Sequence, residues 1–176
     1  MSHLFFALWP DNTVRLKLAR YRLDLARACE GRAVRPDTLH LTLVFIGEVP
    51  ETRVAELAAC GDRVTARLFD LVMDTAGCFD MARVGWLGCS QPAAALFDLQ
   101  FALRSEAAQA GFGLDPRPFK PHVTVVRNVG FPFEPQQLPG INWQVRSFSL
   151  IESIPAESGP AYNILDTWEL SSPPVI

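Results

Sequence analysis

The sequence predicts an α+β protein with a pseudo-symmetric, two-lobed fold, in which antiparallel sheets surround a central cleft and helices pack outside. Apolar, β-prone runs alternate with segments of helical spacing along the 176 residues. The order of elements is roughly duplicated between the two halves of the chain. Two short segments, HLTLVF at 40–45 and HVTVVR at 122–127, also read almost alike. We therefore expect residues 1–176 to form a single two-lobed domain.

The first half is expected to contain two strands and two helices. Residues 4–9 are apolar and precede a proline, which indicates a buried strand. The Asp-Asn pair that follows suits the N-cap of a helix ending at Gly31. The first of the two similar segments predicts a strand over 38–46, and Pro50 suits the first turn of a helix that reaches Val64.

The second half repeats this order with additional strands. Strands at 69–75 and 84–89 precede a third helix, which is expected to run from Pro92 to Gly111. The second of the similar segments predicts a strand over 121–127. Residues 129–140 are expected to form a loop rich in proline and phenylalanine. Two strands are expected at 142–151 and 162–170, with a turn between them at 155–160.

Composition restricts the class of protein. Hydrophobic residues make up 49% and charged residues 20%, which is typical of a soluble globular chain. The net charge of −3 argues against holding nucleic acid by bulk electrostatics. The four cysteines form no C-x-x-C pair, which indicates reduced thiols rather than a metal site or a disulfide framework. No signal peptide or membrane span is visible, so we expect a cytoplasmic protein without a membrane partner.

Each of the two similar segments begins with His-x-Thr, at His40–Thr42 and at His122–Thr124. Residues i and i+2 of a strand share a face, so each motif directs an imidazole and a hydroxyl the same way. One neutral and one protonated histidine provide a base and an acid, while threonine hydroxyls donate to phosphoryl oxygens. Because no carboxylate cluster or Cys/His cage accompanies the motifs, we expect no metal and no cofactor. A strained 2′,3′-cyclic phosphate suits this chemistry, but the near-symmetry leaves open which histidine is the acid.

The motifs HLTLVFIGEV (40–49) and PHVTVVR (121–127) resemble those of the two-histidine phosphoesterase superfamily. The segments FFALWPD, RVGWLG and RPFKPHVT make the chain similar to the RNA 2′,3′-cyclic phosphodiesterases, also named 2′-5′ RNA ligases. The resemblance implies hydrolysis of RNA 2′,3′-cyclic phosphate ends to 2′-phosphomonoesters, with His40 as proton donor and His122 as proton acceptor. It assigns phosphate binding to Thr42, Thr124 and Arg127. It also implies a weak ligation that would create a 2′-5′ linkage.

Two features qualify the resemblance. Simple alternation places Arg127 on the strand face away from His122, so it reaches the site only if the strand ends or bulges there. Residues 154–160 contain no lysine or arginine where family members often carry basic residues. We therefore expect RNA with cyclic phosphate ends or small cyclic nucleotides as substrate, with the hold on a long RNA backbone in question.

Two alternatives use the same pocket: a non-catalytic binder of nucleotides or RNA ends, and a phosphodiesterase of this superfamily acting on another cyclic nucleotide or oligonucleotide end. Nothing in the sequence requires a dimer, so we expect a monomer. Six phenylalanines are expected mostly in the core, namely Phe5, Phe6, Phe45, Phe79, Phe97 and Phe101. Aromatic residues near the second motif and in the following loop are candidates for stacking on a base, namely Phe119, Phe131, Phe133 and Trp143.

Overall fold

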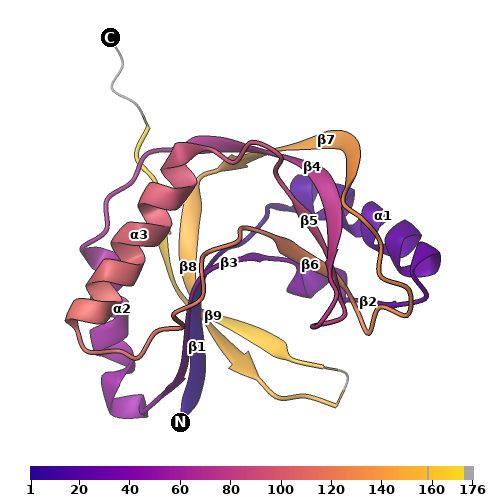
Figure 1. Cartoon of the computed structure of the whole chain (residues 1–176). Helices are drawn as coiled ribbons and strands as arrows, with labels where there is room; N and C mark the ends of the chain where they lie inside the picture. Colours follow the sequence, from indigo (N-terminus) through magenta and orange to yellow (C-terminus); the bar gives the residue numbers. More distant parts are fainter. Residues whose placement is uncertain (158, 173–176) are drawn as a thin grey trace.

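One large antiparallel sheet forms the centre of the computed structural model, which describes residues 1–157 and 159–172 (Figure 1). Its strands in chain order are β1 (Ser2–Leu8), β2 (Arg32–Ala33), β3 (Leu41–Val49), β4 (Phe69–Phe79), β5 (Val84–Gly88), β6 (Val123–Arg127), β7 (Gln136–Val145), β8 (Ser147–Ile154) and β9 (Ala161–Glu169). The helices are α1 (Asn12–Ala28), α2 (Val54–Asp62) and α3 (Ala94–Gln109), and short 3₁₀ turns cover Pro36–Thr38 and Glu51–Arg53.

The strand order divides the sheet into two halves. It is β7-β4-β5-β6-β3-β1-β8-β9, with β2 added to β6 beside this path. One half thus contains β4 to β7, the other contains β1, β3, β8 and β9, and they meet where β3 pairs with β6 at Leu41 and Val123. This arrangement confirms the predicted α+β, pseudo-symmetric fold. The sheets of the two lobes are joined into one at the centre.

The helices cover the two halves separately (Figure 1). Helix α1 packs against β5, β6 and β7, whereas α3 packs against β3 and against α2. As predicted, Asp11 caps α1, because its carboxylate accepts a hydrogen bond from the backbone N–H of Val14 at 2.9 Å. The buried face of α1 carries Val14, Leu18 and Leu25 at helical spacing. Burying these helix faces leaves the central strands to present their polar side chains to the cleft.

Several expectations about the second half were wrong in detail. The loop predicted over 129–140 ends early, since β7 begins at Gln136 and pairs with β4. Strand β7 is the edge strand of its half of the sheet. Pro139 has no backbone N–H to donate, and an edge strand tolerates this because one side of it has no partner strand among the described residues. The single strand predicted over 142–151 is two strands that part at Arg146. The two-residue strand β2 was not predicted.

Some aromatic side chains also lie differently from the prediction. Phe45 is 51% exposed and Phe101 71% exposed, although both were expected in the core, and Phe97 is exposed too. Conversely, Trp143 lies on β7 rather than in a loop and is only 2% exposed, so it is not available to stack on a base. The buried stripe of α3 contains Leu96, Leu99 and Leu103, as their helical spacing predicts, whereas Phe97 and Phe101 lie one turn apart on an exposed part of the helix.

Candidate active site

The junction of β3 and β6 brings the two His-x-Thr motifs together. Leu41 and Val123, the middle residues of the motifs, are direct partners on these antiparallel strands. This register places His40 across from Thr124, and Thr42 across from His122. Both histidines immediately precede their strands rather than lying within them. The buried middle residues face the core, so the histidines and threonines face the cleft.

Each motif strand contains a β-bulge directly after its threonine. On β3, the register with β1 passes from Thr42 to Val44, which leaves Leu43 as the additional residue. On β6, the register with β5 passes from Thr124 to Val126, which leaves Val125 as the additional residue. A bulge restarts the alternation of faces.

The bulges decide which side chains reach the cleft. Leu43 and Val44 are both buried, as are Val125 and Val126, although consecutive residues of a regular strand face opposite sides. The next residue on each strand therefore returns to the face of its threonine: Phe45 on β3 and Arg127 on β6. The sequence predicts that Arg127 reaches the site only if its strand ends or bulges, and the strand contains such a bulge.

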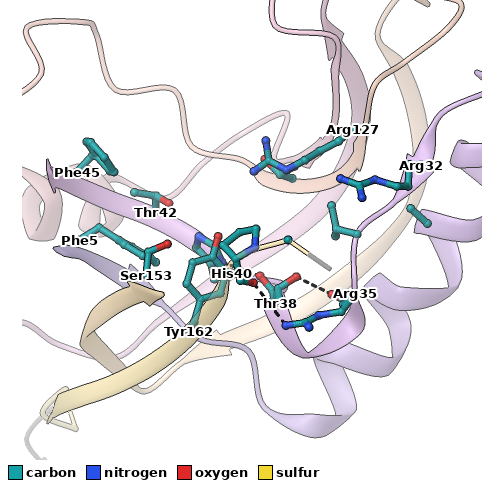
Figure 2. Close-up of a pocket in the computed structure, with 15 residues that line it drawn as sticks. Phe5, Arg32, Arg35, Thr38, His40, Thr42, Phe45, Arg127, Ser153 and Tyr162 are labelled. Atoms are coloured by element: carbon teal, nitrogen blue, oxygen red, sulfur yellow. Dashed lines mark hydrogen bonds between the residues drawn. The ribbon is translucent and has the colours of Figure 1, made fainter. Parts of the chain in front are cut away.

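Four of the five predicted site residues line one cavity of about 440 Å³, within the usual range of small-molecule sites. These are His40, Thr42, Thr124 and Arg127. Figure 2 shows their surroundings, and the remaining polar and aromatic lining includes Phe5, Arg32, Arg35, Thr38, Phe45, Ser153 and Tyr162.

His122 lines the neighbouring cavity, which has a volume of about 530 Å³. Its polar lining includes Thr75, Ser90, Lys120 and Gln137, and its aromatic lining includes Phe79, Trp86 and Phe119. The structure therefore brings both motifs to one cleft but gives each histidine its own side of it.

The rings of the two histidines are oriented in the same way. Nδ1 of His40 lies 2.7 Å from the carbonyl oxygen of Thr38, and Nδ1 of His122 lies 2.7 Å from the carbonyl oxygen of Lys120. Because a carbonyl oxygen only accepts hydrogen bonds, each Nδ1 carries a proton and donates it. In the neutral ring Nε2 is then the unprotonated nitrogen, ready to take a proton or, once protonated, to give one.

Burial lowers the pKa of His40 to about 4, with further lowering by the positive charges of His122 and Arg127. Three aromatic side chains surround its ring. Trp9 stacks on it with ring centroids 5.4 Å apart, and Phe5 and Tyr162 each lie 5.0 Å away. The pKa of His122 is also lowered by burial, and its ring meets the edge of Phe79 at 4.9 Å. Apolar surroundings therefore keep both rings neutral at pH 7 in the free protein.

Residues 8–86 match the family model described as "LigT like Phosphoesterase". An RNA 2′,3′-cyclic phosphodiesterase of Escherichia coli (strain K12) is 36% identical to this chain, over 97% of each. The chain belongs to the RNA 2′,3′-cyclic phosphodiesterase family. A further relative of that name, from Thermus thermophilus, is 33% identical over 95% of this chain and 89% of its own length.

Solved structures of relatives have the same fold. E. coli LigT complexed with 3′-AMP matches with a TM-score of 0.89 and 33% identity, over 97% of this chain and 98% of LigT. LigT has also been crystallised with NADP⁺. These findings confirm the predicted family and the prediction that the chain is an enzyme, a phosphodiesterase.

Several lining residues of this phosphodiesterase were not predicted. Arg32 and Arg35 enter the cavity from the segment that contains β2, and Tyr162 enters from the start of β9. For Arg32 and Arg35, the only signal in the sequence was their position shortly before the first motif. Tyr162 had no signal, because its contact with His40 joins segments more than a hundred residues apart.

Other site types find little support in the described part of the chain. Residues 1–157 and 159–172 contain no group of three or more His, Cys, Asp or Glu side chains suited to a metal ion. None of the helices within these residues is both long and apolar enough to cross a membrane. All four cysteines are free thiols.

Proposed function

We propose that this enzyme hydrolyses the 2′,3′-cyclic phosphate at RNA ends, or in small cyclic nucleotides, to a 2′-phosphomonoester without a metal. The observation that carries the proposal is the pairing of Leu41 with Val123. This pairing sets two imidazoles and two hydroxyls around one point, with each Nδ1 occupied by a carbonyl oxygen. It supplies an acid, a base and phosphate donors, which are the groups that this hydrolysis needs.

In the proposed reaction, Thr42, Thr124 and Arg127 hold the non-bridging oxygens of the phosphate. Nε2 of His122 takes a proton from water as the water oxygen forms a bond to phosphorus. The bond between phosphorus and the 3′-oxygen breaks, and Nε2 of His40 gives its proton to that oxygen. The phosphate remains on the 2′-oxygen, and a proton transfer through solvent restores both histidines.

The two cavities support a separate side for each reactant in this proposal. The 3′-oxygen belongs to the nucleoside, so its proton donor, His40, and the nucleoside occupy the same side. His40 lines the cavity with Tyr162 and Phe45, whose rings suit contact with a nucleoside. Water enters from the opposite side, where His122 lines the second cavity. This arrangement puts the attacking and leaving oxygens on opposite sides of phosphorus.

The role of His40 as donor requires that substrate binding protonates it. In the free protein its pKa is about 4, so the ring is neutral at pH 7. A phosphodiester anion beside the ring favours the charged form and raises that pKa. This interaction exists only when a phosphate is bound, so substrate binding itself favours the protonated, acidic form of His40.

A 5′-hydroxyl can occupy the position of the attacking water, which would create a 2′-5′ linkage. We propose this ligation only as a weak side reaction, because water is far more abundant. We further propose that residues 1–176 act as one domain in a cytoplasmic monomer. The four free cysteines are consistent with a reducing compartment.

The deciding experiment is hydrolysis of adenosine 2′,3′-cyclic phosphate in excess EDTA, with chromatography that resolves 2′-AMP from 3′-AMP. We expect 2′-AMP to form at the same rate with and without chelator. Formation of 3′-AMP would contradict the proposed leaving group, and loss of activity in EDTA would contradict the metal-free mechanism. Tight binding of 2′-AMP without turnover of any cyclic phosphate would instead favour the non-catalytic binder.

A further inference from the structure

Three arginines and no carboxylate line the cavity on the His40 side. Arg127 comes from β6, Arg32 from β2, and Arg35 from the segment just after β2. Figure 2 shows Arg127 and Arg32 along one wall of this cavity, with Arg35 on another. One arginine suffices to neutralise a single cyclic phosphodiester, which carries one negative charge. The cavity therefore holds more positive charge than the scissile phosphate needs.

Arg32 and Arg127 are direct register partners on the antiparallel strands β2 and β6. Like charges on directly opposed residues destabilise a sheet unless a counter-charge lies between them. Neither side chain forms an ion pair with a carboxylate within residues 1–157 and 159–172. Two such arginines side by side are suited to bind either one anion between them or two neighbouring anions, one at Arg127 and the next at Arg32.

Arg35 is held differently and forms the rim of the cavity. Its guanidinium lies 3.4 Å from the carboxylate of Asp37 and 3.5 Å from the carbonyl oxygen of Pro160. The second contact joins Arg35 to Pro160, and the sequence from 154 to 160 contains no basic residue.

We infer that Arg32, beside Arg127, forms a second anion subsite, which binds the phosphate on the 5′-oxygen of the nucleotide that carries the cyclic phosphate. The inference rests on the proposed function, because it places the nucleoside on the His40 side. Paired strands lie about 4.8 Å apart, and the long side chains of two neighbouring arginines can spread from this spacing to reach successive phosphates of one RNA strand. The subsite selects an oligonucleotide end or a 5′-phosphorylated nucleotide over a cyclic phosphate with a free 5′-hydroxyl.

Three substrates with the same scissile bond test the subsite. They are adenosine 2′,3′-cyclic phosphate, the same compound with a 5′-phosphate, and the dinucleotide ApA with a 2′,3′-cyclic phosphate end. The wild-type enzyme should have the higher kcat/KM for the second and third. The second carries a phosphomonoester and the third a phosphodiester, so the two arms show which 5′-phosphate is accepted.

The variant Arg32→Ala should lose this preference, with kcat/KM for the two 5′-phosphorylated substrates falling by about tenfold to a hundredfold. Its kcat/KM for the compound with a free 5′-hydroxyl should fall much less, so the ratio between the substrates changes, which a general structural defect would not produce. Arg32→Lys should restore part of the preference, because it keeps the charge but loses the planar fork. If Arg32→Ala fails to fold, Arg32→Gln provides the same comparison with the side-chain stem retained.

Arg20→Ala is the matched control, since Arg20 is an exposed arginine of α1 that does not line the cavity. It should leave the preference unchanged. Equal kcat/KM for all three substrates in the wild type, or an equal loss on all three in Arg32→Ala, would overturn the subsite but leave the proposed function intact. Hydrolysis of none of them by the wild type would overturn the proposed function, and the subsite with it.

Discussion

Leu41 and Val123 are partners across the line where the two halves of the sheet meet. They are also the middle residues of the two His-x-Thr motifs, so the pairing places equivalent residues of a duplicated pattern against each other. A shift of register by one residue would turn the polar side chains of one motif into the core. The position of the active site therefore depends on the correct pairing of these two apolar residues.

Replacing either of the proposed catalytic histidines should remove most of the activity without unfolding the protein. We expect His40→Ala and His122→Ala each to lower kcat by about 10²–10⁴, which is the usual contribution of one positioned acid or base. Steady-state hydrolysis of adenosine 2′,3′-cyclic phosphate measures this loss, and circular dichroism checks the fold. A double variant that still hydrolyses the substrate at a near wild-type rate would refute the mechanism.

Arg127→Ala should lower kcat/KM by about tenfold to a hundredfold on every cyclic phosphate, whether or not a 5′-phosphate is present. The reason is that the bulge at Val125 turns this guanidinium into the cavity, where the proposed reaction has it hold the scissile phosphate. Comparison with Arg32→Ala on the same three substrates separates the two arginines. A loss confined to substrates with a 5′-phosphate would place Arg127 in the second subsite instead.

The pH optimum for kcat/KM should lie below pH 6.5. This quantity reports the pKa values of the free enzyme, where burial lowers the pKa of His40 to about 4 and lowers that of His122. Activity needs one ring protonated and one neutral, so it is maximal between the pKa of His40 and that of His122, and burial holds both below the pKa of an ordinary histidine. The optimum for kcat should lie at higher pH, because bound phosphate raises the pKa of His40. Coincident optima above pH 7 would contradict this account.

Acid should destabilise the folded protein through His40. Its pKa is about 4 in the folded state against 6.5 for an unperturbed histidine, so the unfolded chain binds the proton more readily. The full stability is present above pH 6.5 and is lost as the pH falls towards 4, by about 3 kcal/mol. Urea unfolding at intervals between pH 7.5 and 4 measures this decrease. His40→Gln should show a smaller decrease, and an unchanged decrease would exclude His40 as the cause.

Gly77→Ala should impair both stability and catalysis. A Cβ at Gly77 would lie 2.2 Å from the ring of Trp86, and that ring packs on Phe79, which contacts His122. We expect a loss of about 1–3 kcal/mol in unfolding free energy, together with a lower kcat.

The matched control for that substitution is Gly61→Ala, in which the new Cβ would lie 2.5 Å from the ring of Trp168, away from the cleft. It should lower the melting temperature but leave kcat unchanged. Equal effects of the two substitutions on kcat would show that the packing around Trp86 does not position His122.

The sequence was a good guide wherever the signal is local. The apolar run of β1 and the cap of α1 appear where the residue pattern placed them, and the motif strands β3 and β6 begin only two or three residues after their predicted starts, because strand and helix periodicity depend on neighbours along the chain. The start of β7 was missed for the opposite reason. Its residues are mostly polar and include Pro139, and they form a strand only because the edge of β4 offers hydrogen-bonding partners.

The duplicated His-x-Thr pattern, with its resemblance to the two-histidine phosphoesterases, predicted the class of enzyme and named the two histidines and two threonines that the structure brings to one cleft, because chemistry of this kind needs those side chains in that spacing. Only the tertiary structure decided the rest. The bulges at Leu43 and Val125 turned Phe45 and Arg127 towards the cleft, the pairing of β2 with β6 set Arg32 beside Arg127, and burial among aromatic rings lowered the pKa of His40. These features arise between segments distant in sequence, where no local pattern of residue types specifies the contact.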